Sequence, residues 1–182
     1  YNHQTLKLLH RKGLKRWVMP VELGRETLIS ILQHANLGDQ IETEVLVCGK
    51  IPLAYSARCY TARTYNLPKD DCHLKCIDHP GGILMENQQE KKLFVLNGIQ
   101  TLSGYDYNLI HEVGSMQEMG VDIVRISPEP EGFQIQVEAM RKAINGEQIP
   151  GNPLLATDRC DGYWFGRPGM ESCYNEPEVS QC

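Results

Sequence analysis

Apolar and polar positions alternate along the chain between a helical and a strand period. Apolar residues recur at helical spacing in four segments, which predicts helices over 4–12, 24–36, 105–118 and 133–145. Short apolar or alternating runs predict strands over 16–19, 41–49, 92–96 and 121–126. Strands that alternate with helices are typical of an α/β domain built on a parallel sheet, here with about four strand–helix units.

One segment interrupts this rhythm. Residues 50–91 lack a clear period, are rich in Tyr, Arg, Asp, Pro and Gly, and contain three of the seven cysteines. A stretch of this length without periodicity inside a compact domain is usually functional or disordered, and the cysteines favour a functional segment. We therefore predict a domain over 1–149 that carries a cysteine-bearing insertion at 50–91. The proline-rich, polar residues that follow predict a tail segment over 150–182.

Composition narrows the class of protein. The 182 residues carry a formal net charge of −5, which argues against a general nucleic-acid binder. No apolar stretch is long enough for a transmembrane helix. An odd number of cysteines without a secretory signal argues against a disulfide framework, so we expect a cytoplasmic protein. Because the first residue is Tyr1, we expect a processed chain or a piece of a longer one.

The cysteines of the insertion have the spacing of a metal site. Cys59 is followed by Cys72 after twelve residues and by Cys76 after three more. One helical turn would place Cys72 and Cys76 on the same side. Three converging thiolates suit an iron–sulfur cluster, and with His79 they also suit zinc. Three unrelated thiols remain the alternative, and Cys48 is expected to be a small buried residue.

Two charged residues are candidates for a pocket. Glu44 and Arg125 lie near the C-terminal ends of their predicted strands, where the active sites of (β/α) barrels form. Glu44 could supply a polar or acid–base group, and Arg125 could bind an anionic substrate. Structural ion pairs are the alternative for both.

Three long runs carry a family resemblance. They are RWVMPVEL at 16–23, EVLVCGKIPLAYSARC at 44–59 and NGIQTLSGY at 97–105. In order, and with the whole cysteine spacing, they resemble ubiquinone-biosynthesis members of the collagenase-like peptidase family, peptidase U32. The resemblance runs from Tyr1 to about Trp164 and begins partway along such proteins.

The resemblance implies a fold and a function. The fold would be similar to a TIM barrel, of which this chain supplies the C-terminal half. Cys59, Cys72 and Cys76 would bind a 4Fe–4S cluster, with a fourth cysteine in an N-terminal half outside this sequence. The protein would be a subunit of an O₂-independent hydroxylase, paired as a heterodimer with a paralogue and acting on a ubiquinone precursor.

The broader family signature bears on the alternatives. The chain keeps Glu44, Gly49, Ile51 and Cys59 of that signature, but Pro52 replaces its first cysteine. This departure argues against peptidase activity. The other function classes left open are a structural zinc-binding α/β interaction module and a peptidase of the same family.

Overall fold

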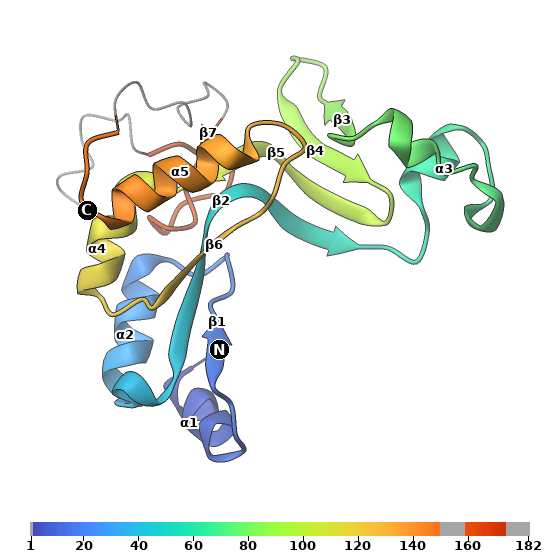
Figure 1. Cartoon of the computed structure of the whole chain (residues 1–182). Coiled ribbons are helices and arrows are strands. Elements are labelled where there is room, and N and C mark those ends of the chain that lie inside the picture. The colour runs from blue at the N-terminus through green and yellow to red at the C-terminus, as the bar shows by residue number, and fades with distance from the viewer. Residues whose placement is uncertain (1, 150–158, 174–182) are drawn as a thin grey trace.

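The computed structural model describes residues 2–149 and 159–173, and within them the chain forms one seven-stranded mixed sheet with helices packed against it (Figure 1). The strands are β1 (Arg16–Val18), β2 (Glu42–Tyr55), β3 (Ile83–Glu86), β4 (Lys92–Asn97), β5 (Gln100–Asn108), β6 (Ile123–Ile126) and β7 (Arg159–Cys160). The helices are α1 (His3–Arg11), α2 (Arg25–Ala35), α3 (Tyr60–Thr64), α4 (Val113–Glu118) and α5 (Phe133–Ile144). Single 3-10 turns are η1 (Gly38–Gln40), η2 (Lys69–Asp71), η3 (Lys75–Asp78) and η4 (Ile110–Glu112).

The parallel part of the sheet follows chain order. β1 and β6 pair with opposite edges of β2, both parallel to it. Helix α2 connects β1 to β2, α4 precedes β6, and α5 follows β6. Leu28 of α2, Val47 of β2, Met116 of α4 and Met140 of α5 meet in the main core, each at most 2% exposed. The predicted α/β class is confirmed in this mixed form.

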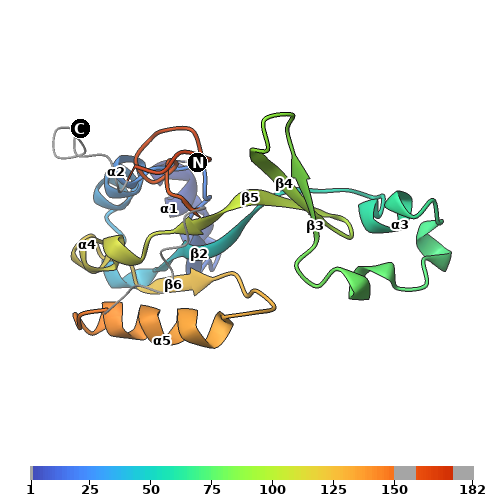
Figure 2. The ribbon, with the colours of Figure 1, turned by 90° about the horizontal axis from the view of Figure 1, so that it is seen from above.

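The remaining strands form an antiparallel arm. Beyond Cys48, β2 continues through register shifts at Lys50–Ala54 and pairs antiparallel with β5, which pairs with β4, which pairs with β3. In Figure 2 these strands leave the helical core and lead to α3 at the far end. The sheet therefore stays open among the described residues. Of the arm, the end of β2 and the strand β3 fall within the predicted insertion at 50–91, whereas β4 and β5 follow it.

One predicted strand–helix unit is wrong. Residues 92–96 lie in β4, as predicted, but the strand is antiparallel and belongs to the arm. Residues 105–108 are not helical; they end β5, whose residues 106–108 pair with 48–50 of β2. The helix begins only at Val113, after Asn108 accepts a hydrogen bond from the amide of Ile110 (3.0 Å). Strand pairing here overrides the local helical spacing.

The described C-terminal segment belongs to the core. β7 pairs with β5, and Trp164 is 1% exposed. The Trp164 indole donates to the Glu112 carboxylate at 2.9 Å. The Trp164 carbonyl accepts from the amide of Arg25, at the start of α2 (2.9 Å). This segment therefore joins the beginnings of α2 and α4. Among the described residues, no helix is both long and apolar enough to span a membrane.

We predict that Gly49→Ala destabilises the fold more than Gly120→Ala. Both glycines have positive φ, at +99° and +85°. A methyl group at Gly49 would lie 2.4 Å from the Ser127 carbonyl oxygen, whereas at Gly120 it would meet nothing within 4 Å. Urea denaturation should show a loss of about 2–4 kcal/mol for Gly49→Ala and about 1–2 kcal/mol for Gly120→Ala. Equal losses would contradict the close packing at Ser127.

Candidate functional site

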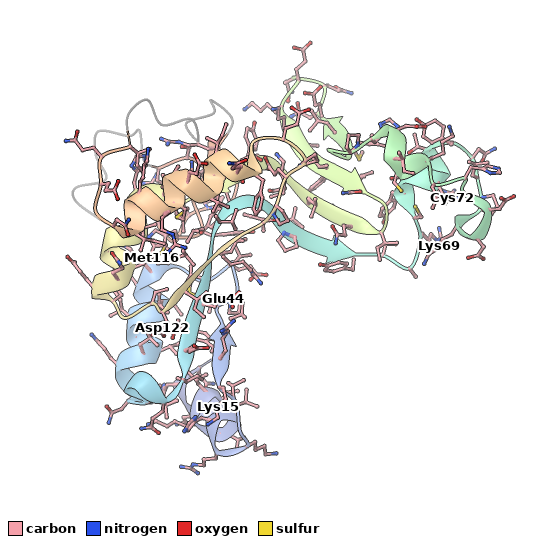
Figure 3. The ribbon with its side chains drawn as sticks, in the orientation of Figure 1. Lys15, Glu44, Lys69, Cys72, Met116 and Asp122 are labelled. Carbon is pink, nitrogen blue, oxygen red and sulfur yellow. The ribbon has the colours of Figure 1, made fainter. Side chains whose placement is uncertain are left out.

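The three predicted cysteine ligands lie together in a small lobe at the end of the arm, which we call the cysteine lobe (residues 56–82). Cys59 caps the N-terminus of α3, where its sulfur accepts from the amide of Ala62 at 3.4 Å. Cys72 follows η2, and Cys76 lies in η3, which packs against α3. Figure 3 labels Cys72 in this lobe, well away from Glu44 in β2.

The prediction that one helical turn carries Cys72 and Cys76 is wrong. His73 and Leu74 between them have positive φ values of +50° and +52°, so the backbone reverses instead of continuing as a helix. The segment between the two cysteines is therefore a loop. Binding and catalytic residues often lie on loops of this kind.

The thiols of the lobe are available, but they do not form a closed site. Cys59 and Cys72 are partly exposed, Cys76 is exposed, and all three are free. Over residues 2–149 and 159–173, no group of three or more His, Cys, Asp or Glu has an arrangement that could hold a metal ion. The Nε2 atom of His79, the alternative zinc ligand, lies 2.5 Å from the Tyr65 hydroxyl.

The other described cysteines differ sharply from those of the lobe. Cys48, Cys160 and Cys173 are at most 3% exposed. Burial, with nearby carboxylates, raises the pKa of Cys48 and Cys160 to about 12 and that of Cys173 to about 11. They are therefore neutral thiols at pH 7, and the expected buried role of Cys48 is confirmed.

Glu44 and Arg125 lie side by side on neighbouring strands. Arg125 Nε is 3.6 Å from one Glu44 oxygen, and Arg16 of β1 is 3.5 Å from the other. Arg16 also pairs with Glu42 at 2.9 Å. The Glu44 side chain is 10% exposed, whereas those of its two arginine partners are about half exposed. Glu44 thus lies between two cations, and about half of the Arg125 side chain remains exposed.

Arg125 opens onto a cleft of about 1010 Å³ where the parallel strands meet the arm. The cleft lies at the C-terminal ends of β2 and β6. Its walls combine apolar and charged side chains. They include Lys50, Pro52, Asp106, Arg125, Glu129 and Glu131. Glu44 does not line this cleft, because it lies near the start of β2 and not, as predicted, near the C-terminal end of the strand.

Sequence reasoning missed the charged cluster in this cleft. Lys50 Nζ lies 2.6 Å from Asp106 Oδ1 and donates to the Gly104 carbonyl at 3.0 Å. Burial and the nearby Asp106 carboxylate raise the pKa of Glu129. Lys50 directly follows the buried run 43–49. A charged residue directly after a buried run is the one feature of the sequence that could have indicated the cluster.

Comparison with known protein families agrees with the sequence runs. A model of peptidase family U32 matches residues 1–147, most of the chain. The chain therefore belongs to peptidase family U32. No solved structure matches the chain.

We predict that thiol modification separates two groups of cysteines. At pH 8, iodoacetamide should label Cys59, Cys72 and Cys76 of the native chain well before Cys48, Cys160 and Cys173. Only thiolates react, and burial both shields the second group and raises its pKa. Mass-spectrometric mapping measures the rates, and labelling in urea is the control in which the two groups should react alike. Equal native rates for Cys48 and Cys76 would contradict the described burial.

Proposed function

We propose that this chain is the C-terminal half of a UbiV-like iron–sulfur protein. In this proposal it pairs with a UbiU-like paralogue as a heterodimer and serves the oxygen-independent ring hydroxylation of a ubiquinone precursor. The single observation that carries the proposal is the cysteine lobe. Its three free thiols are separated from the core, in a chain whose sequence runs resemble that branch of the family.

The residues present suit part of a 4Fe–4S cluster site. Such a cluster takes thiolate ligands, and Cys59, Cys72 and Cys76 supply three from adjoining turns. Arg58, Arg63 and Lys69 lie around Cys59 and would offset the negative charge of a thiolate-bound cluster. The other described cysteines are buried, so the fourth ligand would come from elsewhere, as the resemblance implies.

The arrangement of the strands supports a barrel origin. β1, β2 and β6 are adjacent and parallel in chain order, and each is followed or preceded by a helix, as in a (β/α) barrel. The arm leaves β2 at its C-terminal end, the end at which barrel enzymes place their active sites. We infer that the cysteine lobe and the cleft both belong to that functional end.

When bound, the cluster would supply electron transfer or activation of an oxygen donor. The chain's own residues would orient the substrate. Arg125 presents a half-exposed guanidinium to the cleft, with Glu44 holding its other side, and so offers a fixed cation for an anionic group. Apolar walls next to it would exclude water from the bound ring.

We predict that the full-length protein containing this chain is brown after anaerobic purification. It should show broad absorbance in the visible blue, with about four iron and four sulfide per chain. The triple substitution of Cys59, Cys72 and Cys76 by Ala should remove the absorbance, iron and sulfide. Cys48→Ala is the matched control and should retain them, because Cys48 lies in the core. Colourless, iron-free wild-type protein would overturn the proposal.

The same preparations distinguish the other candidates. About one zinc per chain without sulfide would favour a structural zinc module, for which the lobe also offers His79. Anaerobic ubiquinone synthesis, measured in a strain lacking its UbiV-like protein, should be restored by the wild type and not by the triple variant. If the protein hydrolysed denatured collagen-like peptides and Cys59→Ala abolished that activity, the result would instead favour a peptidase. The presence of Pro52 in place of the first signature cysteine argues against this outcome.

A further inference from the structure

The partly buried carboxyl groups of Asp106 and Glu129 line the cleft between the parallel strands and the arm, together with the ammonium group of Lys50. Asp106 of β5 is paired with Lys50 of β2 at 2.6 Å. Glu129, in the loop after β6, lines the same cleft, and burial together with the like charge of Asp106 raises its pKa. Keeping two neighbouring carboxylates ionised in a partly buried site costs free energy, because like charges repel and water screens them poorly there.

A second observation comes from helix α5. Gln136 is 9% exposed, and its Nε2 atom lies 3.5 Å from Glu129 Oε2. Glu129 Oε1 and Gln136 Oε1 are buried, and neither has a hydrogen-bond partner among the residues that the structure describes. Both oxygens are hydrogen-bond acceptors. A single proton on Glu129 would supply a donor for these two atoms.

Among the described residues, the cations nearest to Asp106 and Glu129 already have partners, including Arg159 of β7, which is in register with Asp106. Lys50 already contacts Asp106 and the Gly104 carbonyl. The thiols of Cys48 on β2 and Cys160 on β7 are neutral because burial raises their pKa to about 12. Arg125 in the same cleft is turned to Glu44. The described residues also lack a group arranged to hold a metal ion.

We propose that Asp106 and Glu129 share one proton at neutral pH, and that Glu129 donates it to an oxygen atom of an organic ligand bound in the cleft. The O–H bond of the Glu129 carboxyl breaks as the new O–H bond forms on the ligand, and Glu129 is left as a carboxylate near Lys50. This proposal concerns the cleft alone and does not depend on a cluster in the cysteine lobe.

Titration of the side-chain carboxyls tests the shared proton. In the ¹³C-labelled chain, with Glu129 assigned through its own backbone resonances, we expect its carboxyl to be still protonated at pH 7, whereas an ordinary glutamate titrates at about pH 4.3. A Glu129 carboxyl that is fully ionised at pH 7 would contradict the shared proton. Asp106→Asn should lower the midpoint by removing the like charge, and Lys50→Met should raise it by removing the cation. A wild-type Glu129 that titrates with the exposed glutamates would overturn the proposal, whatever the variants do.

Carbodiimide modification tests whether a ligand can reach the proton, since these reagents react with protonated carboxyl groups. At pH 7, dicyclohexylcarbodiimide should modify Glu129, as an adduct or as an amide to Lys50, before it modifies the exposed Glu131 of the same cleft. Glu129→Gln should lose that product and keep the others, with circular dichroism confirming its fold. A raised midpoint without modification would overturn donation to a ligand and leave a purely structural proton.

Discussion

The structure depends on the course of one strand. β2 pairs with β1 and β6 as a parallel strand, then continues as the first strand of the antiparallel arm. The change happens at Cys48 and Gly49, where β5 and β6 pair with opposite edges of the same backbone. Gly49 has φ of +99° and lies against Ser127, an approach that only glycine permits without displacement. Both the cleft and the position of the cysteine lobe follow from this bend.

The bend separates two chemical environments. On one side, Cys48 and Cys160 are packed into an apolar core in which a thiolate would be costly. On the other, Cys59, Cys72 and Cys76 lie on short turns with little core beneath them, and their thiols are free. The same residue type thus serves packing in one place and remains available for chemistry in the other. Burial decides between these roles.

Between these regions, the cleft collects charges from segments far apart in the chain. Lys50, Asp106 and Glu129 come from β2, β5 and the loop after β6. Their partial burial weakens screening by water, and burial together with the Asp106 carboxylate raises the pKa of Glu129. Glu44 differs from Glu129 because its neighbours are cations. Arg16 of β1 and Arg125 of β6 each form an ion pair with one of its carboxylate oxygens.

The sequence by itself determined the elements with strong periods. The helices at 24–36 and 133–145 and the strands near 16–19, 41–49 and 121–126 all appear, within a few residues, because apolar spacing alone specifies their buried faces. The runs at 44–59 and 97–105 indicated the family that the match over 1–147 establishes. The cysteine spacing indicated where chemistry would lie, but not the reversed backbone at His73 and Leu74. Only the tertiary structure decided the antiparallel arm, the strand at 105–108 and the charged cluster at Lys50. The strand at 105–108 and the Lys50–Asp106 pair depend on contacts between residues more than fifty positions apart, and the arm depends on the pairing of β5 with the end of β2. Local periodicity contains no information about such contacts.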